Sequence, residues 1–451
     1  MTRRPRRVRL AISATLAWSA VLGGAGGAAA AVAGDGLRYG ATTRLASGVD
    51  YRTFTYRGAH GTARGHLLTV DLRTPGVTVD LLHPGVVAGR GTVSGLADAA
   101  GAVGGINADF FNMSEAQHPG VPATGAAVGP AVATGRALKS AVPPAQRFGP
   151  KLPPGATTED VLAVGTDRIA RLDRLRLAGS VSFEEGTVPL AGLNQYALPV
   201  GGVGLYTSDW GSASRLRAGC GDDTRRAAPC SADTYEVMVS QGEVVDVGEG
   251  PGEGGIPPDA VVLVGREAGA EALRLLEPGD AVDVQQRLVA SAYGGGYRFA
   301  VGGYPILRDG YPLVGLENGV AATRTAAGFG DDGHVMYLLA LDGKAESGNG
   351  LTVRELASLM SGIGAQAAVN LDGGGSSTLV TRAPGASRVK VRNHPAGGTE
   401  RLVANGIGVF TTGGPQRRGR TLDPARLGIE EFPHVQVPAS VEAVVDVQPW
   451  G

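Results

Sequence analysis

The sequence predicts a protein of the α+β class, with a mixed or largely antiparallel β-sheet core and a few packed helices. Short apolar runs bounded by turn residues recur along the 451 residues, whereas helical spacing is confined to a few segments. The 73 glycines and only 5% aromatic residues also favour tight turns and strands over a helical bundle. We expect one domain over residues 36–412, in which residues 140–300 are more variable and resemble an insertion.

The first 33 residues have the pattern of a secretory signal peptide. Five arginines between positions 3 and 9 precede an apolar stretch at 10–22, and Ala31-Val32-Ala33 suits cleavage between small residues. Glycines at 23 and 24 shorten the apolar stretch, and an uncleaved anchor stays as the alternative. No later segment of the sequence has the length and apolarity of a membrane span. We therefore expect a secreted or cell-surface protein.

The net charge limits the expected partners, and the two cysteines indicate a disulfide. The formal net charge is -1, so neither nucleic acid nor an acidic membrane surface is expected as the main partner. The two cysteines, Cys220 and Cys230, share one polar loop, and in an exported chain they most simply form a disulfide. The sequence around them supplies no histidine for a zinc site.

The first elements after the signal are expected to be strands with one short helix. Residues 67–72 and 77–82 are apolar runs around Thr74-Pro75-Gly76, a pattern that predicts a β-hairpin. Ser94 is placed to cap a helix that runs to about residue 100. Residues 103–108 then predict a buried strand that ends at Asp109.

The middle of the chain predicts loops and strands. Residues 112–155 are rich in Gly, Pro and Ala without clear periodicity, which is typical of lids and binding loops. Residues 235–240 and 243–247 flank Gln241-Gly242, which predicts a second hairpin. A short helix is expected at 267–276, ended by a Pro-Gly pair.

The last third has the clearest pattern. Residues 335–341 form an apolar run suited to a buried strand. Thr352 and Glu355 make a capping box for a helix over 352–362, which Gly364 is suited to end. Further strands are expected at 367–371, 377–381 and 403–410, and residues 413–451 form a polar tail.

Residues 370–377 are the most informative segment for chemistry, because their polar groups follow a predicted strand. Three consecutive glycines allow backbone N–H groups to converge on an anion such as phosphate. Asp372 adds a carboxylate beside them. The alternative is a glycine-rich turn capped by the aspartate.

Other polar residues also lie at predicted strand ends. Asn107 and Asp109 share one face of their strand by the alternation of side chains. Arg324 is suited to bidentate recognition of phosphate. Asp342 directly follows the strand at 335–341. The ordinary alternatives are a turn for each aspartate and a surface ion pair for the arginine.

A metal ion stays open at these positions. The side chains of Asn107, Asp109, Asp342, Asn370 and Asp372 would supply the oxygen ligands that Ca²⁺ or Mg²⁺ prefers. No spacing of histidines and cysteines supports zinc.

Taken together, the motifs resemble the phosphodiester glycosidase family. The resemblance covers about residues 64–410, and the Asp-Gly-Gly-Gly-Ser-Ser run at 372–377 is its most specific part. Two positions depart from the family pattern: Tyr304 replaces a small residue, and His394 stands where arginine is frequent. The matching segments are 105–111, 302–307, 324–328, 341–343, 350–352, 355–357, 370–378, 393–395 and 401–405.

The resemblance implies a hydrolase that cleaves a sugar-1-phosphodiester, of the N-acetylglucosamine-1-phosphodiester kind, at the anomeric carbon. The substrate would be a phosphoglycan or a small sugar-1-phosphodiester, for example of a cell wall. Asp109 and Asp372 are the expected catalytic pair, with Asp342 in reserve. The residues expected to bind the substrate and its phosphate are Asn107, Arg324, Asn370, Gly373, Gly374, Gly375, Ser376, Ser377, Asn393 and Arg401.

Two other functions stay open on the sequence. One is a phosphodiesterase that cleaves the other P–O bond. The second is a non-catalytic extracellular carbohydrate-binding protein, against which the clustered carboxylates argue, because binding alone does not need them.

Overall fold

The computed structural model describes residues 36–343 and 350–412. These residues fall within one compact unit and are built mostly from β-strands. The predicted signal peptide at 1–33 and the predicted polar tail at 413–451 lie outside the described residues.

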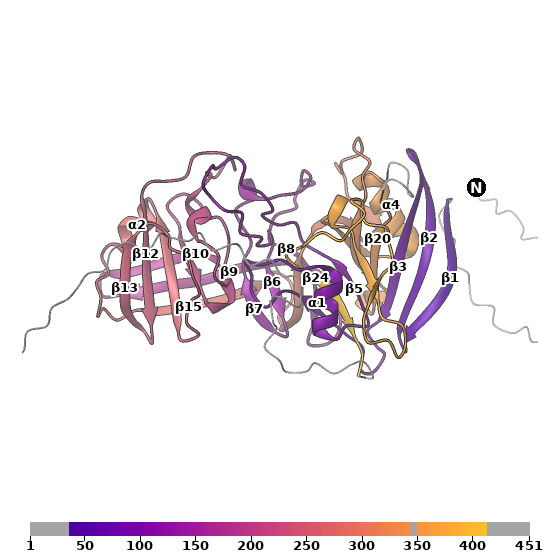
Figure 1. Ribbon diagram of the computed structural model, residues 1–451, viewed down its shortest axis with the longest axis horizontal. Coiled ribbons are helices and arrows are strands. Elements are labelled where there is room, and N and C mark those ends of the chain that lie inside the picture. Colours follow the sequence, from indigo (N-terminus) through magenta and orange to yellow (C-terminus); the bar gives the residue numbers. More distant parts are fainter. Residues whose placement is uncertain (1–35, 344–349, 413–451) are drawn as a thin grey trace, which may run out of the picture. The chain divides into compact units, whose positions relative to one another are not determined.

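An antiparallel eight-stranded sheet joins early and late parts of the chain (Figure 1). In spatial order its strands are β1 (Leu37–Ala46), β2 (Val49–Gly58), β3 (Gly61–Asp71), β20 (Val335–Leu341), β19 (Thr325–Gly330), β21 (Ala367–Leu371), β17 (Tyr304–Arg308) and β18 (Tyr311–Pro312). Because β3 pairs directly with β20, the first strands of the described chain are held in place by the C-terminal third.

A five-stranded antiparallel sheet covers one face of the eight-stranded sheet. Its strands, in spatial order, are β23 (Lys390–Val391), β22 (Leu379–Thr381), β5 (Gly104–Asn107), β24 (Gly406–Phe410) and β4 (Thr78–Leu82). Ile106 and Ile407 of this sheet share one buried cluster with Leu68 and Leu338 of the larger sheet. The two sheets therefore form a β-sandwich.

Two helices complete the sandwich. Helix α4 (Val353–Ile363) packs Leu356 and Met360 against the other face of the eight-stranded sheet, where they meet Leu339 and Ala368. Helix α1 (Val93–Ala100) lies on the outer side of the five-stranded sheet, in a cluster that includes Val380. The eight-stranded sheet is thus covered by the five-stranded sheet on one face and by α4 on the other, and α1 covers the outer face of the five-stranded sheet.

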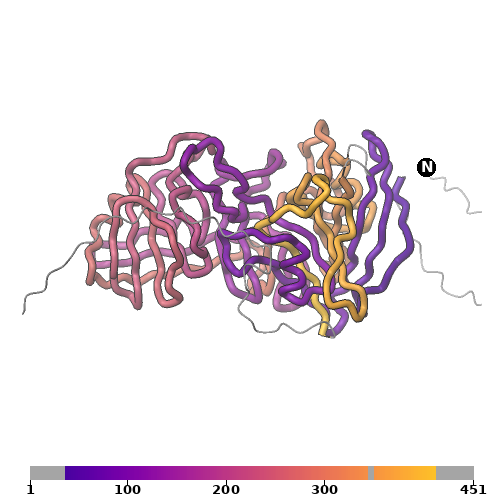
Figure 2. The backbone as a smooth tube through the Cα atoms, viewed as in Figure 1, coloured from indigo at the N-terminus to yellow at the C-terminus, as the bar shows by residue number. Residues whose placement is uncertain are grey.

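The middle of the chain forms an eleven-stranded sheet. In spatial order its strands are β13 (Glu243–Glu249), β12 (Thr234–Ser240), β14 (Ala260–Arg266), β11 (Val203–Tyr206), β10 (Gly186–Leu193), β9 (Ala170–Phe183), β8 (Asp160–Gly165), β16 (Tyr297–Gly302), β6 (Ala131–Ala133) and β7 (Arg136–Lys139), with β15 (Asp283–Ala290) paired to β9. Figure 2 shows the path of the backbone through the middle of the chain. Strand β16 returns the chain to the eight-stranded sheet, because only Gly303 separates it from β17.

Short helices occupy several connections. Helix α2 (Ala268–Leu273) packs Leu273 beside Val237 and Leu263 of the eleven-stranded sheet. The 3₁₀ turns are η1 (Pro144–Gln146), η2 (Ser208–Trp210), η3 (Leu216–Gly219), η4 (Asp331–Gly333) and η5 (Gly374–Ser376). In the part of the chain that the structure describes, no helix has the length and apolarity needed to cross a membrane.

Several predicted elements are confirmed. Strands β20 and β21 occupy the residues that the sequence predicts for them. Helix α4 has the expected capping box between Thr352 and Glu355 and ends at Gly364, whose φ of 106° lies in the left-handed region. Strands β12 and β13 form the predicted hairpin.

Other predictions need correction. The α+β class is only partly confirmed, because strands dominate and the few helices are short. The hairpin predicted at 67–82 is wrong: β3 pairs with β2 and β20, whereas β4 pairs with β24 in the other sheet. The turn between β3 and β4 exists, with the Val77 N–H donating to Thr74 O at 3.1 Å, but it carries the chain from one sheet to the next.

The segment at 112–155, predicted as a lid or binding loop, is largely tied to the rest of the molecule. Its buried Glu115 makes a 2.6 Å contact with the imidazole of His118 and a 2.6 Å ion pair with Arg217. His118 in turn bonds Ala228 O at 2.8 Å, and Arg217 donates to Cys220 O at 2.8 Å. These bonds fix the segment to the loop of residues 220–230.

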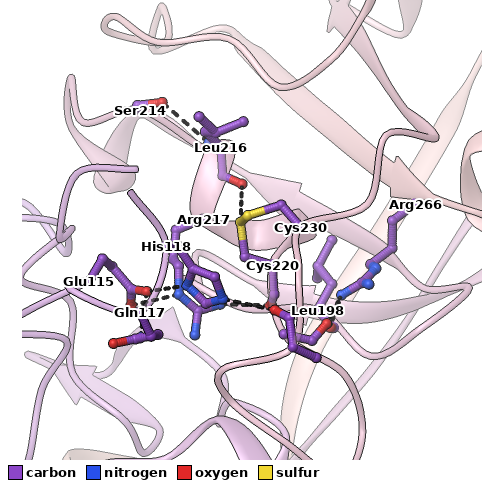
Figure 3. The surroundings of a disulfide bond; sticks show 12 residues. Glu115, Gln117, His118, Leu198, Ser214, Leu216, Arg217, Cys220, Cys230 and Arg266 are labelled. Atoms are coloured by element: carbon purple, nitrogen blue, oxygen red, sulfur yellow. Dashed lines mark hydrogen bonds and ion pairs between the residues drawn. A yellow bond between two sulfur atoms is a disulfide. The ribbon is translucent and has the colours of Figure 1, made fainter. Parts of the chain in front are cut away.

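The predicted disulfide is present, and it closes that loop (Figure 3). Cys220 is fully buried, and the bond to Cys230 holds the backbone carbonyls that receive His118 and Arg217. The disulfide therefore anchors the segment at 112–155 as well as its own loop.

Candidate active site

The ends of β21 and β5 meet at Asp372. The Asp372 N–H donates to Ala108 O at 2.8 Å, and the side-chain amide of Asn107 donates to Asp372 O at 2.7 Å. Two segments separated by the whole middle of the chain are thereby brought together. Asp109 follows Ala108, so the expected catalytic pair lies on neighbouring strand ends, as the sequence hypothesis requires.

Asn107 holds the glycine turn in place. Its carbonyl oxygen accepts from the Thr325 hydroxyl and from the Thr378 N–H, both at 3.0 Å. The Thr325 hydroxyl also lies 3.0 Å from the Ser377 hydroxyl. Because Asn107, Thr325 and Ser377 are fully buried, their contacts indicate a role in shaping the site rather than in touching the substrate.

The turn after Asp372 does not form the amide cradle that the sequence suggested. The N–H groups of Gly374, Ser376 and Ser377 donate to the carbonyls of Thr323, Gly373 and Gly374, at 2.8, 3.2 and 3.3 Å respectively. A backbone N–H committed to a carbonyl cannot also converge on a phosphate. The alternative of a glycine-rich turn describes this backbone better.

Arg401 is the cation beside the turn. It is exposed, and its guanidinium donates to the Ser376 hydroxyl at 3.3 Å. A Cβ atom on Gly375 would lie 2.5 Å from the Arg401 Nη2, so glycine is needed for the arginine to lie across the turn. The residue thus presents a positive charge next to Asp372.

Arg324, the sequence-based candidate for phosphate, is used elsewhere. Its guanidinium donates to Leu351 O at 2.9 Å and to Val320 O at 2.7 Å, and it lies 3.6 Å from the Glu317 carboxylate. The arginine is buried, so these backbone contacts satisfy it within the fold. The structure therefore directs its side chain toward the start of α4.

Asp372 is a partly exposed carboxylate with an altered proton affinity. Burial raises its pKa to about 6, although the Ser376 hydroxyl, the Arg401 charge and the Gly373 N–H all favour the ionised form. A carboxyl that titrates near neutral pH and reaches solvent is a candidate for acid or base chemistry.

Asp109 lies behind the turn and is closed to solvent. It is 1% exposed, its Oδ2 accepts the Gly129 N–H at 2.6 Å, and its own N–H donates to Asn405 Oδ1 at 3.0 Å. Burial raises its pKa to about 6, and the neighbouring Asp372 charge adds to this while Lys139 opposes it. Its Oδ1 is buried without a hydrogen-bond partner.

Asp342 belongs to a separate group of side chains at the end of β20. Its Oδ1 accepts from His66 Nε2 at 3.1 Å and from the His394 N–H at 2.8 Å. Burial acts to raise the pKa of Asp342, but the bonds from His66 and His394 outweigh it and the pKa is lowered. The carboxylate is therefore held ionised by the fold.

Sequence reasoning missed His66. This buried residue lies on β3, and the Tyr51 hydroxyl lies 2.8 Å from its Nδ1. It pairs with Ala340 across the sheet, which brings it beside Asp342. The sequence contained one usable signal, because His66 directly precedes the strand predicted at 67–72. Only the pairing of β3 with β20 brings Asp342 next to this histidine.

The two predicted asparagines differ in role. Asn393 is committed to the backbone: it accepts the Leu379 N–H at 2.8 Å and donates to Ser377 O at 2.8 Å. Asn370 is 1% exposed, yet neither atom of its amide has a hydrogen-bond partner. A buried amide of that kind calls for a water or a ligand group, so Asn370 keeps its candidacy as a binding residue.

The fit to a metal ion is poor. Among residues 36–343 and 350–412, no group of three or more His, Cys, Asp or Glu side chains is arranged to hold one. Asp342 is engaged by His66, and one oxygen of Asp109 is engaged by Gly129. Two of the carboxylates suggested for Ca²⁺ or Mg²⁺ are therefore already engaged by protein groups.

These features define a class: an extensively β-structured protein whose strand ends gather carboxylates of raised pKa beside an exposed arginine. Residues 233–410 match the family model described as phosphodiester glycosidase. The resemblance predicted from the motifs is thereby confirmed. No curated protein matches the sequence.

Solved structures share the fold. A hypothetical protein from Synechocystis superposes with a TM-score of 0.63 at 20% identity, over 82% of this chain and 63% of that one. A putative exported protein from Burkholderia pseudomallei gives 0.59 at 25% identity, over 78% and 75% of the two chains. The zebrafish N-acetylglucosamine-1-phosphodiester alpha-N-acetylglucosaminidase catalytic domain gives 0.41 at 12% identity, over 83% and 87%, which is too remote to support an inference. The chain thus spans less than two thirds of the Synechocystis protein's length.

Proposed function

We propose that the protein is an exported hydrolase that cleaves sugar-1-phosphodiesters, of the N-acetylglucosamine-1-phosphodiester kind, at the anomeric carbon. The match of residues 233–410 to the phosphodiester glycosidase family model supports the reaction class. The observation that carries the proposal is Asp372, a partly exposed carboxyl whose pKa is raised by burial to about 6, beside the exposed Arg401. A sugar-1-phosphodiester needs a positive charge to bind its phosphate and a carboxylate to act at its anomeric carbon.

The chemistry follows from these two side chains. Arg401 binds the phosphate through charge-assisted hydrogen bonds, while ionised Asp372 stabilises the positive charge that develops at the anomeric carbon. The C1–O bond breaks and its electron pair leaves with the phosphate oxygen. Water then adds to C1, and its proton passes to a carboxylate. A phosphate monoester is a good leaving group, so the first step does not depend on a general acid.

Export is part of the proposal. The Cys220–Cys230 disulfide suits an oxidising compartment, and a structural neighbour carries the description of a putative exported protein. A phosphoglycan outside the cytoplasm, such as one of a cell wall, would then be within reach of the enzyme.

The experiment is an assay of the chain from residue 34 onward against a panel of sugar-1-phosphodiesters in ¹⁸O-labelled water. Label in the sugar supports cleavage at the anomeric carbon, whereas label in the phosphate supports a phosphodiesterase. Asp372→Asn should lose most of the turnover and stay folded. Asp246→Asn, at an exposed position of β13, is the matched control and should retain it. Binding of glycans without any turnover would instead indicate a carbohydrate-binding protein.

A further inference from the structure

A buried lysine stands behind the site and has no part in the function proposed so far. Lys139, at the end of β7, is 1% exposed. Its ammonium lies 2.5 Å from Gly129 O, 2.6 Å from Ser140 O and 3.3 Å from Val128 O. An ammonium has three N–H donors, and here three carbonyls accept them. These three acceptors favour the charged form, whereas burial lowers the pKa of Lys139 to about 7 and the Asp109 charge opposes that shift.

One peptide unit joins this lysine to Asp109. Gly129 accepts from Lys139 through its carbonyl, and its N–H donates to Asp109 Oδ2 at 2.6 Å. The backbone at residue 129 thus lies between a buried cation and a buried carboxylate. A change in the charge of Lys139 or of Asp109 therefore acts on the backbone of Gly129, which both side chains bond.

Close packing fixes this arrangement. A Cβ atom on Gly129 would lie 2.6 Å from the Gly302 Cα, and a Cβ atom on Gly302 would lie 2.5 Å from Asp109 Oδ2. Contacts this short exclude a side chain at either position. The Asp109 Oδ2 therefore lies against the backbone of Gly129 and of Gly302 at the end of β16.

Charges from several elements face the pair. Lys139 of β7 favours ionised Asp109, whereas the Asp372 charge after β21 disfavours it. Burial raises the pKa of Tyr304 on β17, and the negative charges of Asp109 and Asp372 raise it further, so this phenol stays neutral. Burial also raises the pKa of Tyr196, with a contribution from Asp109. Lys139 thus favours ionised Asp109 from the interior, and Arg401 favours ionised Asp372 from the surface.

We propose that Lys139 is a positioning residue of the hydrolytic site, which holds Asp109 through the Gly129 peptide and keeps that carboxylate ionised behind Asp372. The inference rests on the proposed function, because positioning Asp109 affects the reaction only if Asp372 is a catalytic residue. The site is active while both Asp109 and Asp372 are ionised, so protonation of Asp109 contributes to the acid limb of the reaction. Without Lys139, Asp109 would take up a proton at neutral pH.

The first test is the pH profile of kcat/KM for Lys139→Met in the mature chain. We expect the acid limb to move to higher pH by about one unit, because a neighbouring opposite charge shifts a carboxyl by roughly that amount. Lys151→Met, at an exposed position, is the matched control and should leave the limb in place. A folded Lys139→Met variant with the wild-type profile would overturn the proposal.

The second test needs neither a variant nor turnover. The Gly129 amide proton of the wild-type chain, followed by NMR from pH 4 to 9, should shift with a midpoint near 6, the pKa to which burial raises Asp109. A Gly129 signal that does not move over this range would overturn the proposal even if Lys139→Met fails to fold. If the wild-type chain hydrolyses no phosphodiester, the proposed function fails, while this titration still decides whether Gly129 and Asp109 act together.

Discussion

Arg401 and Arg324 have different roles although they are the same residue type: one lies beside the turn of the site, and the other stabilises the fold. Arg324 has its guanidinium bound by the carbonyls of Leu351 and Val320, so it stabilises the connection to α4. Arg401 is exposed, and among the described residues its guanidinium donates to the Ser376 hydroxyl alone, so its remaining donors are available to an anion. The difference lies in what surrounds each arginine, since both belong to family motifs.

Replacing Arg401 should weaken the binding of the phosphate. We expect Arg401→Ala to raise KM for a sugar-1-phosphodiester by about tenfold or more, because a charge-assisted hydrogen bond contributes roughly 1.5–3 kcal/mol. Steady-state kinetics at pH 7.5 measure the effect, with Arg388→Ala as an exposed control. An unchanged KM for Arg401→Ala, together with a raised KM for a folded Arg324→Lys, would return the phosphate site to Arg324.

The carboxyls of the site predict the acid limb of the reaction. Burial raises the pKa of both Asp109 and Asp372 to about 6, so both become protonated as the pH falls through that value. Activity should therefore decline below about pH 6 and recover when the enzyme is returned to pH 7.5. The measurement is kcat/KM between pH 4.5 and 8. Constant activity down to pH 4.5 would contradict the assignment of Asp372.

At the scale of elements, the site depends on two strand ends that meet. Strand β21 delivers Asp372, β5 delivers Asn107, and a hydrogen bond between them joins the two sheets of the sandwich. Asn393 adds a second connection, from β22 to the turn. Two of the buried polar residues that the sequence singled out, Asn107 and Asn393, therefore serve this joint.

The disulfide element predicts a measurable contribution to stability. Reduction of Cys220–Cys230, with 10 residues of separation, should lower the free energy of unfolding by roughly 2–3 kcal/mol through loop-closure entropy. Urea unfolding with and without reductant measures this change. The Cys220→Ser, Cys230→Ser double variant should have the same free energy of unfolding as the reduced protein, and reductant should not change it. Equal stability of the oxidised and reduced forms, with both thiols shown free by labelling, would refute the expectation.

At the scale of the whole molecule, the eight-stranded sheet makes the site a product of the complete domain. Strands β1–β3 join the rest of this sheet through the pairing of β3 with β20. The site residues lie between that sheet and the five-stranded sheet. Burial that raises the pKa of Asp372 is therefore a property of the assembled sandwich.

This burial predicts a conflict between stability and function. A folded-state pKa of about 6 exceeds the ordinary 3.8, so the folded protein favours protonated Asp372. The stability from this group is complete below pH 3.8 and is lost as the pH rises through 6. Asp372→Asn should therefore be inactive yet more stable than wild type at pH 7.5, by about 1 kcal/mol after allowance for partial exposure.

Urea unfolding at pH 7.5 and at pH 4 measures this conflict. The gain in stability of Asp372→Asn should be present at pH 7.5 and absent at pH 4, where the wild-type carboxyl is protonated. Asp246→Asn, on the exposed side of β13, should show no gain at either pH. A loss of stability for Asp372→Asn at pH 7.5 would contradict the raised pKa.

The sequence by itself determined what depends on neighbours in the chain. The capping box of α4, strands β20 and β21 and the hairpin of β12 and β13 follow from local spacing. The motifs likewise indicated the family whose model matches residues 233–410, since motifs are read along the sequence. Short cysteine spacing was enough to predict the disulfide.

Only the tertiary structure decided which side chains act together. It separated the runs at 67–72 and 77–82 into two sheets, directed Arg324 away from the turn, and placed His66 beside Asp342. It also put Lys139 behind Asp109 through a single peptide. Each of these facts rests on contacts between strands distant in sequence, where burial and charge act through space and local pattern carries no information.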